Sequence, residues 1–106
     1  MFLTALLTVQ PGEPEITVTD SDIEVSYITL RWTPPSNDGG SPVIDYNVAV
    51  DGDDQLRTLP PVTGTQTLID NLKSKSSYTF ILSARNIVGY GRSVSRTIKT
   101  KFEGTL

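Results

Sequence analysis

Apolar and polar residues alternate along two stretches of the chain that flank a loop rich in proline and glycine. Leu30 and Trp32 alternate with polar neighbours, and after the loop apolar residues return at every second position from Ile44 to Val50. A period of two with one apolar side is typical of strands that bury one face. Pro34-Pro35 cannot donate ladder hydrogen bonds, and Gly39-Gly40 permits backbone angles that other residues avoid. The pattern predicts two strands joined by this loop, with Trp32 in a sandwich core.

The second half of the chain carries a matching alternation. Apolar residues recur at every second position from Tyr78 to Ala84, while Ile81 falls on the opposite, outward side. A Tyr that starts a strand after a polar corner fits the tyrosine corner of Greek-key sandwiches, in which its hydroxyl bonds back to the backbone a few residues upstream. We therefore expect Tyr78 to make such a bond and Leu72, in the corner, to be buried.

The alternation predicts seven strands, and no window shows a helical repeat of useful length. The expected strands are Glu15–Thr19 with Ile16 and Val18 inward, Tyr27–Thr33, Val43–Asp51, Gln55–Leu59, Thr65–Ile69, Ser77–Asn86 and Ser93–Thr100. Asp51-Gly52-Asp53-Asp54 predicts a hairpin turn, because Asp and Gly are preferred in such turns. We expect two antiparallel sheets, with the third, sixth and seventh strands sharing a sheet with the short fourth strand.

The chain resembles a fibronectin type III domain over roughly residues 14 to 100, on motifs that occur in order and in register. The matching residues are Leu30-x-Trp32-x-Pro34-Pro35, Asp38-Gly39-Gly40-Ser41-Pro42-Val43, Tyr46-x-Val48, Leu72, Tyr78-x-Phe80, Ala84-x-Asn86 and Gly89-x-Gly91. The resemblance implies an all-β, seven-stranded antiparallel immunoglobulin-like sandwich. It also implies a structural core that includes Leu30, Trp32, Tyr46, Leu72 and Tyr78.

At 106 residues the chain holds one domain. We assign residues 13–101 to the fibronectin type III domain and 102–106 to a C-terminal tail. Residues 1–12 are interpreted as a linker or the remnant of a preceding module. The alternatives for this apolar start are a truncated signal or an extra edge strand, and it is too short to span a bilayer, so no membrane insertion by this segment is expected.

Charge is distributed unevenly along the sequence. Eleven of the twelve acidic residues precede residue 71, and seven of the nine basic residues follow residue 70, for a net charge of −3. One interpretation is a module with an acidic and a basic end, and the other is a surface whose charges neutralise their neighbours. Asp45 and Arg85 are expected to lie close together on adjacent strands. Nucleic-acid binding is disfavoured, because the net charge is negative and no aromatic residues are interleaved with the bases.

Composition argues against an enzyme and against a metal site. The chain has no His and no Cys, which removes the usual general base and the commonest metal ligands. The acids of Asp51–Asp54 lack the spacing and the closing carboxylate of a calcium loop. Gly89-Tyr90-Gly91 lacks the third glycine and the following helix of a phosphate-binding loop. We expect no catalytic residues, no metal and no cofactor.

Two functions remain. The first is a module that mediates protein binding or adhesion through strand faces and the loops at 37–42 and 86–92, with neighbouring domains in a larger protein and an extracellular or cell-surface location. The second is a structural spacer that sets distance or elasticity, in an extracellular or cytoskeletal protein. Self-association through Phe2–Val9 is a third possibility. The candidate partner-binding residues are Asn47, Ile81, Arg85, Tyr90 and Arg92.

Overall fold

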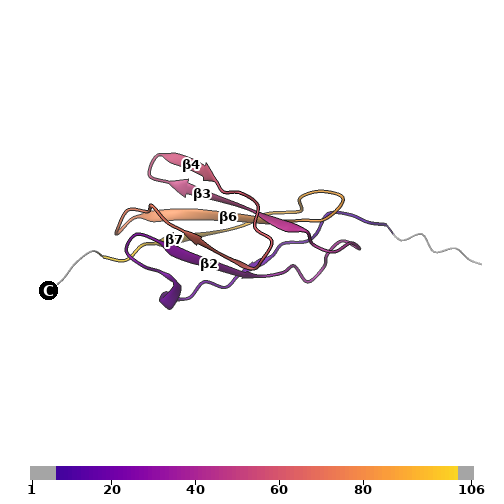
Figure 1. Cartoon of the computed structure of the whole chain (residues 1–106), viewed down its shortest axis with the longest axis horizontal. Helices are drawn as coiled ribbons and strands as arrows, with labels where there is room; N and C mark the ends of the chain where they lie inside the picture. The colour runs from indigo at the N-terminus through magenta and orange to yellow at the C-terminus, as the bar shows by residue number, and fades with distance from the viewer. Residues whose placement is uncertain (1–6, 103–106) are drawn as a thin grey trace, which may run out of the picture.

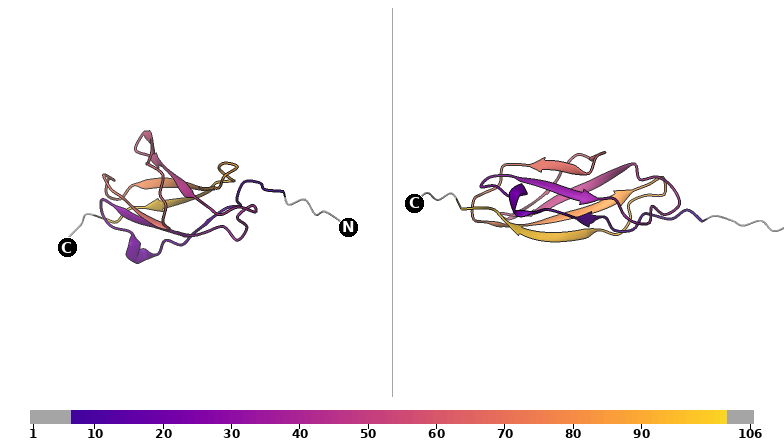
Figure 2. Two further views of the ribbon diagram at one scale, coloured as in Figure 1. Left: turned by 45° about the vertical axis from the view of Figure 1, so that its right-hand side comes forward. Right: turned by 90° about the horizontal axis from the view of Figure 1, so that it is seen from below.

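A computed structural model describes residues 7–102, in which seven strands and a single 3₁₀ turn form (Figure 1). The elements are β1 (Glu15–Ile16), η1 (Asp20–Asp22), β2 (Ile28–Thr33), β3 (Asp45–Gly52), β4 (Gln55–Thr58), β5 (Gln66–Ile69), β6 (Ser77–Arg85) and β7 (Val94–Lys99). One antiparallel sheet has the order β1-β2-β5 and the other β4-β3-β6-β7. The two sheets face each other as the layers of a sandwich (Figure 2). The predicted fold class and the assignment of strands to sheets are confirmed.

The core lies between the sheets and is built from every second residue of the central strands. In β2, β3 and β6 the inward residues are almost fully buried, because the side-chain period of two matches the apolar pattern. These residues are Ile28, Leu30, Trp32, Tyr46, Val48, Val50, Tyr78, Phe80, Leu82 and Ala84. Leu72 is also buried, at 5% exposure. All five predicted core residues are therefore in the core.

Trp32 and Tyr46 contact each other across the two sheets. Their ring centroids are 5.2 Å apart and their planes are tilted by 60°, a geometry that aromatic pairs favour. Trp32 is only 3% exposed, so its large ring contributes through apolar packing. Burial raises the pKa of the Tyr46 hydroxyl.

The tyrosine corner forms as predicted. The Tyr78 hydroxyl accepts a hydrogen bond of 2.8 Å from the backbone N–H of Lys73, while its ring is buried at the start of β6. Asn71, two residues before Lys73, has a φ of 57°, which turns the chain sharply ahead of the corner. The bond therefore fixes the crossing from β5 to β6, that is, from one sheet to the other.

The turn between β3 and β4 is tighter than the sequence indicated. Only Asp53 and Asp54 lie between the strands, with φ values of 55° and 59°. Two consecutive positive φ values define the type I′ turn, whose twist matches that of antiparallel strands. Asp tolerates this conformation better than most residues but less well than Gly.

Two arginines close the open sides of the sandwich. Arg57 of β4 lies opposite Val50 and Arg96 of β7 lies opposite Phe80, so both side chains start on the core-facing side of edge strands. Arg57 donates to the backbone oxygen of Asp70 at 2.9 Å, and Arg96 donates to that of Val18 at 3.0 Å. Each guanidinium thus joins one sheet to the segment that borders the other.

The first strand differs from the expectation. β1 ends at Ile16 instead of Thr19, although Val18 is buried as predicted. The reason is local: Asp22 accepts hydrogen bonds from Thr19 and a 2.7 Å bond from Arg31 of β2, which stabilises the η1 turn. Extended pairing is therefore replaced by a capped turn. The other strand ends agree with the prediction to within two residues.

A second correction concerns Ile44, which was expected on the buried face. It lies one residue before β3 and is 47% exposed. The apolar–polar alternation of β3 extends back to Ile44 in the sequence. However, no element among the described residues covers the Ile44 side chain.

The tyrosine corner leads to a first prediction. Tyr78→Phe removes the hydroxyl but keeps the buried ring, so the N–H of Lys73 loses its acceptor. We expect the free energy of unfolding, measured by urea denaturation, to fall by about 1–2 kcal/mol. Tyr27→Phe, at a 42% exposed tyrosine, is the control and is expected to leave stability unchanged; equal losses in both variants would contradict the role of the corner.

The β3–β4 turn leads to a second prediction. Asp54→Gly relieves the backbone cost of a positive φ while leaving Asp53, which pairs with Lys73 at 3.0 Å. The Asp-Gly sequence is strongly favoured in type I′ turns, and we expect a gain of about 0.5–1 kcal/mol in the free energy of unfolding. A loss of stability in the same urea titration would show that the Asp54 side chain stabilises the turn.

Candidate functional site

The β6–β7 loop lies at the end of the sandwich where residue 7 enters, away from residue 102 (Figure 1). Its shape is set by Asn86, which is 1% exposed. The Asn86 side-chain oxygen accepts hydrogen bonds from the N–H groups of Val88 at 2.9 Å and Gly89 at 3.4 Å. Backbone bonds between Asn86 and Gly89 run in both directions. The loop is therefore held by its own first residue.

Beside the loop, Arg85 forms an ion pair with Asp45 of the adjacent strand. The guanidinium donates to both carboxylate oxygens, at 2.8 and 2.6 Å, and its central carbon lies 5.7 Å from the centre of the Tyr90 ring. The hydrogen bond from Arg85, aided by charge attraction, holds the pKa of Asp45 below its ordinary value, although burial acts in the opposite direction. The same pair raises the pKa of Arg85. The expected proximity of these two residues is confirmed.

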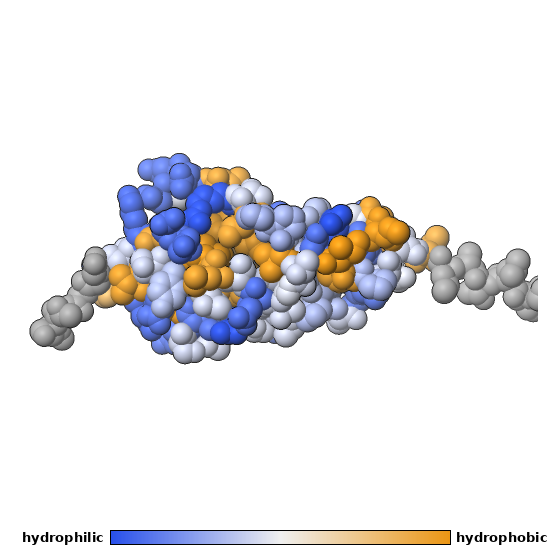
Figure 3. Space-filling view, in the orientation of Figure 1, coloured by the Kyte–Doolittle hydropathy of each residue, from blue (hydrophilic) through white to orange (hydrophobic). Residues whose placement is uncertain are grey.

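Large apolar side chains are exposed on the β6–β7 loop, which follows Arg85 in the chain. Ile87 is 77% exposed, Val88 46% and Tyr90 43%. Ile44 belongs to the same region, because its N–H donates to the backbone oxygen of Arg85 at 2.7 Å. Figure 3 shows apolar surface near this end of the molecule. We call Ile44, Ile87, Val88 and Tyr90 the loop patch.

The predicted residues on the sheet face are less accessible than those of the loop. Ile81 is half-buried and lies opposite Ala49 of β3 and Ser95 of β7. Asn47 is half-buried opposite Ser83, which is itself only 8% exposed. Both side chains belong to the outward face of the four-stranded sheet, where their cross-strand neighbours Ser83, Ala49 and Ser95 are small. It adjoins the loop patch at Arg85.

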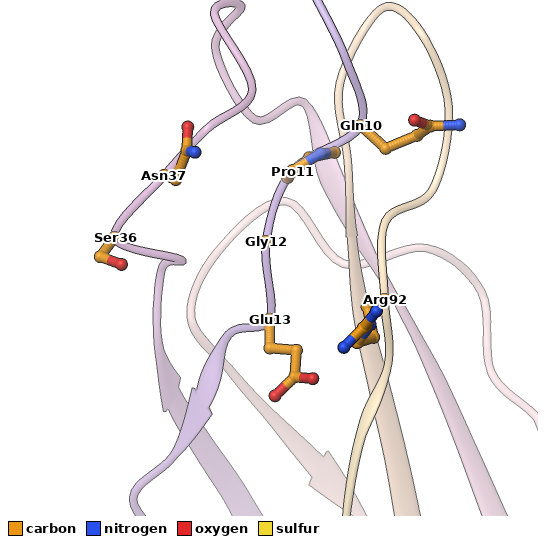
Figure 4. Close-up of a pocket in the computed structure, with 7 residues that line it drawn as sticks. All are labelled: Gln10, Pro11, Gly12, Glu13, Ser36, Asn37 and Arg92. Atoms are coloured by element: carbon orange, nitrogen blue, oxygen red, sulfur yellow. The ribbon is translucent and has the colours of Figure 1, made fainter.

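Arg92 lies apart from the other predicted residues. It lines a shallow open hollow with Glu13 on the opposite wall (Figure 4). The remaining lining residues are Gln10, Pro11, Gly12, Ser36 and Asn37. The five predicted binding residues thus occupy three places: Arg85 and Tyr90 touch, Asn47 and Ile81 share the sheet face, and Arg92 borders the hollow.

Two ion pairs join the acidic first half of the sequence to its basic second half. Lys73 pairs with Asp53, and Arg85 pairs with Asp45, so basic residues of the second half meet acidic residues of the first. The acids of the β3–β4 turn therefore lie at the same end as Lys73. These two pairs favour the interpretation in which neighbouring charges neutralise each other.

Within residues 7–102, the acidic side chains nowhere gather into a group that would hold a metal ion. No helix in this part of the chain is long and apolar enough to cross a membrane.

Sequence reasoning named the loop but missed the residues that carry its chemistry. Asn86 was cited only as part of a motif, and Ile44 was expected on the buried face of its strand. The adjacent pair Ile87-Val88, between a strand and a glycine, was the available signal: two large apolar residues in a short polar loop cannot both be buried.

Comparison with known proteins identifies the family. The fibronectin type III domain family matches residues 10–101, and the chain belongs to it. The human cell adhesion molecule DSCAM is 35% identical over 107 residues, which cover 98% of this chain and 5% of that protein. Titin of Drosophila melanogaster is 31% identical over 98 residues, or 88% of this chain. The chain thus spans only a small part of its relatives.

Solved structures agree with this assignment. A crystal structure of titin domains matches 88% of this chain and 33% of its own chain, with a TM-score of 0.73 and 26% identity. The solution structure of a human fourth FNIII domain matches 99% of this chain and 90% of its own, with a TM-score of 0.79; at 20% identity it shows the fold alone. Both settings that the sequence allowed, the cell surface and the cytoskeleton, are represented among the relatives.

The Asp45–Arg85 pair leads to a prediction of pH dependence. The pKa of Asp45 is lowered from 3.8 in the folded protein, so its stabilisation is complete above the unfolded value and is lost as pH falls through the folded value. Asp45→Asn is expected to reduce the free energy of unfolding at neutral pH, with the gap to the unchanged protein closing between about pH 5 and pH 2.

Urea denaturation at several pH values measures this gap directly. Asp22 also has a lowered pKa, because Arg31 and Thr19 donate to it, but it is present in both proteins and cancels in the difference. A gap that stays constant with pH would contradict the pair's role.

Proposed function

We propose that this domain is a non-enzymatic module of a larger protein that binds a protein partner through the loop patch and the adjoining sheet face. The single observation that carries the proposal is the exposure of Ile87, Val88 and Tyr90 on a loop whose backbone is held by a buried side chain. The candidate residues Arg85 and Tyr90 lie in this surface, and Asn47 and Ile81 extend it along the sheet.

Two free-energy costs favour partner binding at this loop. Leaving large apolar side chains in water is unfavourable, so a cluster of them on a surface is characteristic of a contact site. Binding also costs the entropy of ordering a loop. Here the hydrogen bonds of Asn86 already order the loop in the free protein, so binding does not require that loss of entropy. An aromatic ring stacked on an arginine is further typical of residues that dominate binding energy.

Family membership supports a modular, non-catalytic role. One group of relatives consists of cell adhesion molecules, which favours an extracellular or cell-surface location and a protein partner. Arg92 and the hollow at Glu13 lie apart from the loop patch and are not needed for this proposal. The absence of His and Cys from the whole sequence agrees with a non-enzymatic role.

A spacer role is the second candidate, and one observation favours it. Residues 7 and 102 leave the sandwich at opposite ends (Figure 1), so modules on either side are held in series, as a structural array requires. The similarity to titin agrees with this arrangement. In either role, we propose that the domain begins at residue 13 and is followed by a tail at residues 102–106.

Site-specific photo-crosslinking tests the binding function. A photoreactive amino acid at position 87 of the chain is exposed to a membrane-protein extract of the source cells, and the same group at Leu56, 65% exposed on β4, is the control. The partner crosslinked only from position 87 is then purified. Ile87→Ser with Tyr90→Ser is expected to weaken its binding at least about tenfold, since buried anchors typically contribute 1–2 kcal/mol or more.

The matched control is Leu56→Ser with Leu68→Ser, which removes two equally exposed apolar side chains away from the loop. It is expected to change the affinity less than about twofold, as peripheral surface changes do. Equal weakening by both pairs, or none by the loop pair, would overturn the proposal. Loss of function of the larger protein on deleting the module, with no effect of the loop pair, would instead support the spacer role.

A further inference from the structure

The segment from Val9 to Gly12 lies directly against the end of the sandwich. The Val9 N–H donates to the Gly39 backbone oxygen at 2.9 Å, and the Gly12 N–H donates to that of Asn37, also at 2.9 Å. Pro11 is buried. The segment is therefore attached to the β2–β3 loop by backbone hydrogen bonds on either side of a buried proline.

Two glycines make this close approach possible. A Cβ atom on Gly91 would lie 1.8 Å from the Pro11 backbone oxygen, and one on Gly39 would lie 2.1 Å from that of Val9. Real Cβ atoms do not come this close to backbone, so any other residue at these positions pushes the segment away. Gly39 also has a φ of 80°, which other residues adopt at a cost.

Asn86 joins this segment to the β6–β7 loop. Its side-chain nitrogen donates to the backbone oxygens of Val9 at 2.7 Å and Asp38 at 2.8 Å, while its oxygen accepts from Val88 and Gly89. A carboxamide has two donor hydrogens and an oxygen with two lone pairs. All four positions are used, so the group cannot turn to improve one contact without losing another.

We infer that Asn86 is a positioning residue that couples the loop patch to the segment by which the chain enters the domain. Losing the Val9 carbonyl leaves a buried amide donor without its acceptor, and the carboxamide must then rotate or admit water. Either change disturbs the acceptor of the Val88 and Gly89 N–H groups. The position of the segment from Val9 to Gly12 and the conformation of the binding loop are thus linked. The affinity of a partner that binds the loop therefore depends on where this segment lies.

This inference rests on the proposed function only in calling the loop a binding site, because the coupling itself is measured without a partner. Amide hydrogen exchange by NMR is followed at Val88 and Gly89 in a chain shortened to begin at Gln10. A chain that begins at Thr8, and therefore keeps Val9, is the matched control. We expect exchange at both loop amides to accelerate at least about fivefold in the first chain and to stay unchanged in the second.

The reciprocal variant is Asn86→Ala, with Asn47→Ala on the sheet face as its control. Asn86→Ala is expected to accelerate exchange at Val9 and Gly12 by about tenfold or more, although neither residue is altered. In each protein the amides of Phe80 and Leu82 report global unfolding. Only an acceleration larger than that of the Phe80 and Leu82 amides supports the coupling. A general loss of stability, which accelerates all amides, therefore does not mimic the result.

Loop amides that exchange at the same rate with and without Val9, relative to the strands, would overturn the coupling. That outcome leaves the proposed function intact, because the loop patch is then ordered independently of the segment. Conversely, full partner binding by the Ile87 and Tyr90 variants would overturn the function while leaving the exchange result unaffected.

Discussion

The structure depends on the burial of one face of each central strand. β2 supplies one wall of the core and β3 and β6 the other, and the Trp32–Tyr46 contact spans the gap between them. Because side chains alternate, a slip of one residue in any of these strands would bring polar side chains into the core. The register is therefore strongly specified, and every loop begins at a defined place.

Several polar contacts connect the two sheets at the edges and at the end of the sandwich, outside the apolar core. The Tyr78 hydroxyl fixes a crossing between the sheets. The guanidinium groups of Arg57 and Arg96 join the two sheets at the two edges of the sandwich. At the end where the chain enters, Asn86 fills the same role with four hydrogen bonds from one buried side chain. The polar groups that shape this end are buried, while the apolar side chains of the loop patch are outside. This inversion of the usual pattern is the reason we propose a binding site in this region.

The sequence predicted the fold almost completely, for a physical reason. Alternation in strands as long as β3 and β6 determines which residues are buried, and the tyrosine corner follows from the position of Tyr78. The two errors have different local causes. β1 is shortened because Asp22 caps a turn, and Ile44 is exposed because the alternation extends beyond the covered part of the sheet.

The site was predicted less well, because its contacts are between distant residues. Asp45 and Arg85 were expected to be neighbours, since sheet pairing brings them together. Nothing in the sequence near Asn86 indicates that its side chain reaches Val9, 77 positions away. Ile81 was expected on the outward face, and it lies there between Ala49 and Ser95, but it is half-buried.

The central claim is that the loop carrying the exposed apolar residues is rigid in the free protein. Backbone ¹⁵N relaxation of the unbound chain measures this directly. The account predicts order parameters for Ile87 to Tyr90 close to those of the β6 amides, at about 0.85, whereas values below about 0.6 would show a flexible loop and contradict it.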